Sequence, residues 1–177
     1  MTLTDLHGLL RLNARPIERP TDEQISCAEA ELGVLLPEDY KQFIKHYGRG
    51  SISAFIRLCS PGSNIDSANL MSVAKGDWDG YATLKQEFPD EFTYPRYPEA
   101  RGLLPWADTI NGDTVYWLTD GSPNAWPIVM FGRSCDRHHV FHCGMVEFVK
   151  RLVNGKIRGS PFPESINFSR GEYIAAS

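Results

Sequence analysis

Histidines and cysteines gather in one short stretch, residues 135–143, which reads Cys-Asp-Arg-His-His-Val-Phe-His-Cys. Cysteine and histidine are ligands that Zn²⁺ prefers, and a structural zinc site needs four of them in tetrahedral geometry. If the stretch is a β-strand, His138 and His142 point to one face and His139 and Cys143 to the other. No face then collects four ligands, and no second cluster in the sequence completes the set. We therefore interpret the stretch as a surface strand with one half-buried histidine, and we predict no metal site.

The same stretch also contains the residue types of a cysteine nucleophile and a histidine base. Such a pair needs the base within hydrogen-bond reach and an oxyanion site beside the nucleophile. Cys135 could lie near His138 or His139, but nothing in the sequence marks a nucleophile turn or a pair of amide donors. Cys59 and Cys143 resemble small buried hydrophobic residues. The sequence favours a protein that is not an enzyme, and a small zinc-dependent enzyme built around His138 to Cys143 is the less favoured alternative.

Three carboxylates border a predicted β-hairpin, and two of them could approach each other as an acid–base pair. They are Asp108, Asp113 and Asp120. Aspartate is also preferred at hairpin ends and turns, where its side chain forms local hydrogen bonds. The Asn111-Gly112 turn already accounts for these residues. A structural role in the turn is therefore the favoured interpretation over catalysis.

Trp78 differs from the other tryptophans because it stands between two acidic residues. Aromatic anchors surrounded by charge are typical of protein interfaces. Burial of Trp78 within the domain is an equal alternative, since tryptophan is highly buried on average. The residues that we predict to face a protein partner are Asp77, Trp78, Asp79, Asp108, Asp113 and Asp120.

The composition is that of an ordinary folded domain. The chain has 177 residues, of which 42% are hydrophobic and 23% charged, enough to bury a core in one domain. The net charge of −4 argues against direct nucleic-acid binding, which needs a basic face. Four scattered cysteines form no disulfide pattern, and no run approaches the roughly 20 apolar residues of a membrane-spanning helix. Because the N-terminus also lacks the pattern of a secretory signal, we expect a cytoplasmic protein with no membrane contact.

The stretch from residue 20 to residue 48 predicts two helices, with clear signals at their ends. Thr21 can cap the first helix, and Gln24 completes a capping box. Gly33 supplies the left-handed stop. Pro37 belongs to the start of the second helix, and Gly48 ends it. The predicted buried faces of the two helices consist of Ile25, Ala28, Leu32, Tyr40, Phe43, Ile44 and Tyr47.

The remaining patterns predict an α+β fold. Asn111-Gly112 predicts a two-residue hairpin turn with inverted backbone twist. Residues 65–92 are compatible with one or two helices, which Gly76 and Gly80 would interrupt. The other expected elements are an N-terminal helix over residues 3–12, strands near 53–59, 103–107, 114–118, 126–131 and 138–142, and a closing helix over 145–153. We predict a single domain in which an antiparallel or mixed sheet of about four to six strands packs against the N-terminal helix pair and the closing helix.

The order of these motifs resembles the SUKH superfamily. A capped helix ends in Leu32-Gly33, and an apolar link leads into Leu36-Pro37-Glu38-Asp39-Tyr40. Later, Leu104-Pro105-Trp106-Ala107 precedes an Asn-Gly-Asp turn, an aromatic strand and a Trp-Pro-aliphatic strand. The resemblance covers residues 20–162, with residues 1–19 as a helical extension and 163–177 as a tail. Residues 65–98 and the tail depart from the pattern.

The resemblance implies a binding protein without a cofactor. The superfamily is named partly for a fungal regulator of cell-wall synthesis, and most of its bacterial members look like immunity proteins that bind and neutralise a cognate toxin. It therefore implies a toxin domain as the partner, with nucleases among the candidates because an acidic surface complements a basic substrate cleft. The alternative is a regulatory scaffold that binds host proteins, and the lack of long disordered extensions argues against it.

Overall fold

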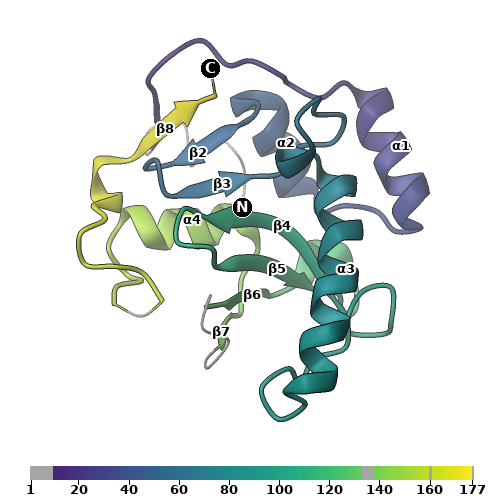
Figure 1. Ribbon diagram of the computed structural model, residues 1–177. Helices are drawn as coiled ribbons and strands as arrows, with labels where there is room; N and C mark the ends of the chain where they lie inside the picture. Colours follow the sequence, from purple (N-terminus) through teal and green to yellow (C-terminus); the bar gives the residue numbers. More distant parts are fainter. Residues whose placement is uncertain (1–9, 133–137, 160, 177) are drawn as a thin grey trace.

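The structure is a computed structural model that describes residues 10–132, 138–159 and 161–176, with only the backbone described at positions 78 and 79 (Figure 1). These residues form one eight-stranded sheet in the order β1-β8-β2-β3-β4-β5-β6-β7. β1 and β8 are parallel, and the other neighbouring strands are antiparallel. The predicted α+β class with a mixed sheet is confirmed. The strands are β1 (Arg11–Leu12), β2 (Gly50–Ile52), β3 (Ile56–Leu58), β4 (Leu103–Thr109), β5 (Thr114–Leu118), β6 (Ile128–Phe131), β7 (His138–Phe141) and β8 (Glu172–Ala175).

The predicted helix pair is confirmed, including the signals at its ends. The Thr21 hydroxyl accepts a hydrogen bond from the Gln24 amide at 3.2 Å, and the Gln24 side chain accepts one from the Thr21 amide at 2.9 Å. Gly33 has φ +74°, as a left-handed helix stop requires. The helices are α1 (Asp22–Leu32), α2 (Glu38–Tyr47), α3 (Leu70–Glu87) and α4 (Met145–Val153), with short 3-10 turns η2 (Asp66–Ala68), η3 (Pro123–Ala125) and η4 (Phe168–Arg170).

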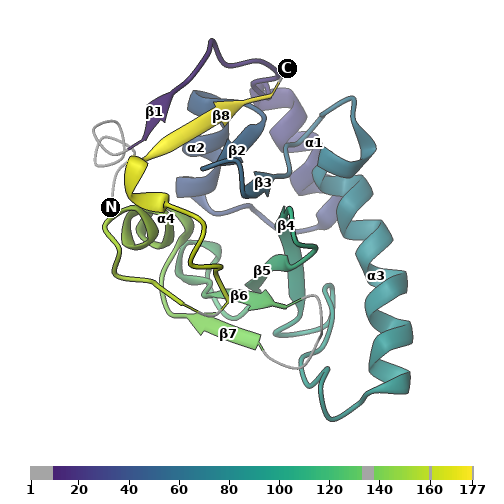
Figure 2. The same ribbon diagram turned by 60° about the vertical axis from the view of Figure 1, so that its left-hand side comes forward.

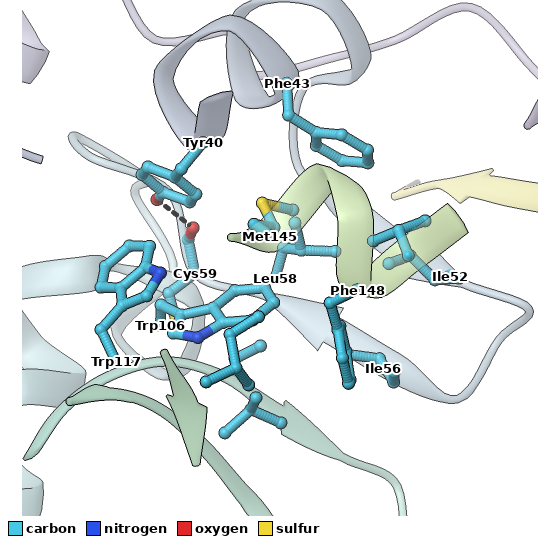
Figure 3. Packing of buried hydrophobic residues seen from close by; sticks show 14 of the residues in the cluster. Tyr40, Phe43, Ile52, Ile56, Leu58, Cys59, Trp106, Trp117, Met145 and Phe148 are labelled. Atoms are coloured by element: carbon cyan, nitrogen blue, oxygen red, sulfur yellow. Dashed lines mark hydrogen bonds between the residues drawn. The ribbon is translucent and has the colours of Figure 1, made fainter. Parts of the chain in front are cut away.

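The main core lies between one face of the sheet and the helices α2 and α4. Figure 3 shows Tyr40 and Phe43 of α2 and Phe148 of α4 in one cluster with side chains of the sheet. Tyr40 donates its hydroxyl to the backbone oxygen of Cys59 at 2.6 Å, which ties α2 to the end of β3. The rings of Tyr40 and Trp117 meet edge to face with centroids 4.9 Å apart. Burial of this apolar surface is the main contribution that holds the two helices on the sheet.

A second core lies on the opposite face of the sheet, under the C-terminal half of α3. Successive residues of a strand point to opposite faces, so Trp117 belongs to the main core and its neighbour Tyr116 to the second one. Tyr81 of α3 packs there with Phe92 and Phe131. The second core reaches β4 through β7, and α3 leaves the β8-β2-β3 part of this face uncovered (Figure 2).

The sheet, the hairpin loop and the N-terminal segment differ from the sequence-based predictions. The sheet has more strands than the predicted four to six, because three short strands, β1, β2 and β8, extend it at one side. The hairpin loop has three residues, 110–112, and only Gly112 has a positive φ, so the turn is not the predicted two-residue type. The predicted N-terminal helix lies largely outside the described residues, and its last two positions form β1.

α3 is one continuous helix of 18 residues and is not interrupted at its glycines. The Asn69 side chain caps its start by accepting hydrogen bonds from the amides of Met71 and Ser72 at 2.9 and 3.2 Å. Gly76 and Gly80 are exposed, and a Cβ atom at either position would meet no atom within 4 Å. Packing of the apolar side chains of α3 therefore outweighs the low helix propensity of glycine.

Alanine at both Gly76 and Gly80 is expected to raise the free energy of unfolding by about 1–2 kcal/mol, because glycine costs roughly 0.5–1 kcal/mol per helix interior position. Urea unfolding of the double variant measures this gain. Gly33→Ala is the matched control, since its Cβ also enters open space but at φ +74°. The control variant should lose stability, and a gain of similar size in both variants would contradict the explanation.

Candidate protein-binding site

Asp77 lies on the side of α3 that meets the sheet. Its carboxylate accepts a hydrogen bond from the Tyr116 hydroxyl of β5 at 2.8 Å. Burial raises the pKa of the Asp77 carboxyl to about 6, although the hydrogen bond from Tyr116 acts in the opposite direction. The side chain therefore has a partner inside the fold and contributes to the docking of α3 on the sheet.

Trp78 and Asp79 are the other two members of the predicted Asp-Trp-Asp site. Trp78 and Asp79 have their backbone within α3, and their side chains lie outside the described residues. Their part in partner binding stays a prediction.

The predicted hairpin carboxylates each contact a side chain of the fold. Asp108 holds Arg57 of β3 by two hydrogen bonds, from Nε at 2.7 Å and from Nη2 at 2.5 Å. Asp113 is buried and accepts a hydrogen bond from the Thr109 hydroxyl at 2.6 Å. This contact closes the hairpin loop, as the preference of aspartate for turns predicts.

Asp120 lies at the other end of the hairpin, just after β5. Its carboxylate is 3.2 Å from Nε of the exposed Arg101. The structure thus brings Asp108 and Asp113 to the turn end of the hairpin and leaves Asp120 at the opposite end. Asp77, Asp108, Asp113 and Asp120, the four of these residues whose side chains are described, do not form one cluster.

Within the histidine stretch, His138–Phe141 form β7 at the edge of the sheet, where a strand was predicted over 138–142. The ring of His138 stacks on Phe131 with centroids 5.3 Å apart and meets Tyr94 edge-on at 5.1 Å. In the described part of the chain, no three histidine, cysteine or acidic side chains are placed to hold a metal ion. Cys135 lies outside the described residues.

Two described cysteines, Cys59 just after β3 and Cys143 just after β7, lack the features of a nucleophile. Burial raises the pKa of the Cys143 thiol and raises that of Cys59 far more. A raised pKa disfavours the thiolate, which is the reactive form. The two side chains therefore behave as packing residues.

An exposed aromatic residue among acidic residues occurs at the free end of α3. We call Glu87, Phe88, Asp90 and Glu91 the acidic tip. Phe88 is 47% exposed, and the three acidic residues around it are also exposed. The amide of Phe92 donates to the Phe88 backbone oxygen at 3.1 Å, and the Phe92 side chain is buried, so the segment is anchored.

The acidic tip projects from the body of the domain in both views (Figures 1 and 2). An accessible, anchored aromatic ring surrounded by charge has the character of an interface anchor. Phe88 is not among the residues that the sequence patterns predict to face a partner. The signal that could have found it is the occurrence of three acidic residues within five positions around one phenylalanine and a proline.

A comparison with protein-family models matches residues 22–142 to the family described as SMI1-KNR4 cell-wall, SUKH_6. The match spans more than half of the chain, from α1 to the end of β7. The chain belongs to the SMI1-KNR4 cell-wall family. The SUKH resemblance of the sequence motifs is thereby confirmed, and within the SUKH match lie the helix pair, the α3 region and the hairpin.

Searches among curated proteins and among solved structures each found no match for the chain. In the described part of this SUKH protein, no helix is long and apolar enough to cross a membrane.

Proposed function

We propose that this SUKH protein is a non-enzymatic immunity protein that binds a cognate toxin domain and blocks it. Membership of the SMI1-KNR4 cell-wall family carries the proposal. The environments of Cys59 and Cys143 support a role in binding over catalysis, because neither thiol is activated. Asp77, Asp108 and Asp113 likewise have partners within the fold.

We place the main partner contact at the acidic tip. Its exposed Phe88 supplies apolar contact area, and its carboxylates complement a basic surface such as the substrate cleft of a nuclease. The predicted site at Trp78 and Asp79 lies on the same helix, two turns before the tip. The candidate surface is therefore the acidic tip, and Trp78 and Asp79 stay predicted contact residues.

Affinity capture from the lysate of the host, followed by mass spectrometry, tests the proposed function. The tagged full chain should recover one toxin-like domain at equal stoichiometry. Co-expression of the chain with that domain should then rescue cells that the domain alone kills. Recovery of several unrelated host proteins, with no rescue, would replace the immunity role by that of a regulatory scaffold.

Phe88→Ala is expected to weaken binding of the captured domain about tenfold, or about 1.4 kcal/mol, because an exposed aromatic anchor is lost. The combined Glu87→Gln, Asp90→Asn and Glu91→Gln variant should slow association and reduce its dependence on salt. Isothermal titration and stopped-flow mixing measure the two effects.

Leu35→Ala is the matched control for the aromatic anchor, since Leu35 is 63% exposed in the link between α1 and α2. Its affinity should equal that of the unmodified chain. If the Phe88 and tip-carboxylate variants also bind with the affinity of the unmodified chain, the acidic tip is not part of the interface. That result would leave the proposed immunity function itself unaffected.

A further inference from the structure

A hollow of about 350 Å³ lies on the uncovered part of the sheet, where η2 overhangs β2, β3 and β8. Its charged lining residues are two arginines, and no carboxylate occurs among its described lining residues. The rest of the lining is small or apolar. The residues that matter for its chemistry are Arg49, Ser51, Arg57, Ile65, Ser67 and Ile174.

Register places the polar groups of the hollow on one face. Ser51 pairs with Arg57 of β3 on one side and with Ile174 of β8 on the other. Arg49 lies just before β2, lines the same hollow, and accepts at its backbone oxygen a hydrogen bond from the Ala176 amide at 3.0 Å, which continues the pairing with the β8 segment. Arg49 and Arg57 are diagonal neighbours across two strands, a separation that long side chains can span.

The two arginines are held in the same way, and both keep one side of the guanidinium available. Arg49 donates from Nε and Nη2 to Glu18, at 2.7 and 3.2 Å. Arg57 donates from the same two atoms to Asp108. Neither Nη1 has a hydrogen-bond acceptor among the described residues. Each arginine is thus fixed by one carboxylate and can donate to a second acceptor.

The charge balance of the hollow indicates what it can bind. The charge of each guanidinium is already neutralised by the carboxylate it holds, Glu18 or Asp108. A strongly hydrated inorganic anion therefore gains little binding free energy in the hollow. A hydrogen-bond acceptor attached to an apolar group gains more binding free energy. Ile65, which is 46% exposed, and Ile174 offer apolar surface beside the free Nη1 donors. The hydroxyl groups of Ser51 and Ser67 add two further donors.

We propose that this hollow is a binding site for a small organic carboxylate with an apolar body. Its carboxylate accepts from Nη1 of Arg57 and Arg49, and its body covers Ile65 and Ile174. The site lies on β2, β3 and β8, apart from the acidic tip, and it does not depend on the proposed toxin partner.

Titration of the full ¹⁵N-labelled chain with hexanoate, followed by amide chemical shifts, tests the site. Hexanoate should give saturable shifts at the hollow, and 1-hexanol and acetate should each bind at least tenfold more weakly because each lacks one of the two features. The proposal is overturned if hexanoate gives no saturable shift, if 1-hexanol binds equally well, or if inorganic phosphate binds more tightly.

Arg57→Gln should weaken hexanoate binding about tenfold, since it removes one of the two guanidinium donors. Arg101→Gln is the matched control, because Arg101 also pairs with an aspartate but lies outside the hollow. Ser67→Phe fills the hollow from an exposed position and leaves both ion pairs intact, so it tests the site even if Arg57→Gln does not fold. Unchanged hexanoate binding in Ser67→Phe would overturn the proposal.

Discussion

Replacement of Trp117 by alanine is expected to lower the free energy of unfolding by about 4 kcal/mol. Trp117 is 1% exposed, stacks on Trp106 with centroids 5.6 Å apart, and contacts Tyr40 and Trp126. It therefore joins β5 to β4, to α2 and to the segment before β6, and alanine would leave a large cavity among them. Urea unfolding, followed by far-ultraviolet circular dichroism, measures the loss, which is a large share of the roughly 5–15 kcal/mol of a typical domain.

Trp117→Phe separates the loss of volume from the loss of a polar contact. The indole Nε1 of Trp117 has no hydrogen-bond acceptor among the described residues. Trp117→Phe should therefore lower the free energy of unfolding by less than half as much as Trp117→Ala, because no hydrogen bond is lost. Phe88→Ala serves as the surface reference and should stay within about 0.5 kcal/mol of the unmodified chain. A Trp117→Ala loss below about 1 kcal/mol would contradict the packing described for the main core.

Replacement of Asp77 by asparagine is expected to raise stability at pH 7–8 by about 2 kcal/mol. The folded-state pKa of Asp77 is raised from 3.8 to about 6, so the folded chain holds this proton more tightly than the unfolded chain does. Asparagine carries no charge, fits the same space, and keeps an oxygen that can accept the hydrogen bond from Tyr116. Burial of the ionised carboxylate is the cost that the variant removes.

The sign of the pH dependence follows from the raised pKa. The stabilisation from protonated Asp77 is fully present below about pH 3.8, falls as pH rises toward 6, and is lost above pH 6. The difference in unfolding free energy between Asp77→Asn and the unmodified chain should therefore grow across this window and then level off. Urea unfolding at a series of pH values measures it.

Tyr116→Phe provides the control for the Asp77 prediction. The hydrogen bond from Tyr116 lowers the pKa of Asp77, so its removal should move the carboxyl titration above pH 6, as carbon-detected nuclear magnetic resonance can follow. A titration of Asp77 near pH 4 in the unmodified chain would contradict the burial that the structure shows.

Signals within a few residues of each other were sufficient to predict the helix pair. The capping box of Thr21 and Gln24 and the stop at Gly33 involve contacts between residues at most four positions apart. Such contacts form in the same way wherever the segment lies in the fold, because they satisfy the backbone groups at the helix ends. The β4–β5 hairpin was predictable from its local turn signal, and the SUKH resemblance was visible in local motifs. The length of the hairpin loop was not predicted correctly.

Long-range pairing decided the rest of the fold and the surfaces. β1 and β8 are strands of two and four residues, too short to give a clear pattern. They form because β8 pairs with β1 on one side and with β2 on the other, across long separations in the sequence. The position of α3 buries Asp77 against Tyr116 and leaves Phe88 exposed, although both residues belong to one acidic region of the sequence. Register likewise set Arg57 beside Asp108, 51 residues away. Sequence patterns thus predicted most of the elements and the family. Tertiary contacts determined which charged and aromatic side chains stay exposed to a partner, because burial depends on neighbours that are distant in the chain.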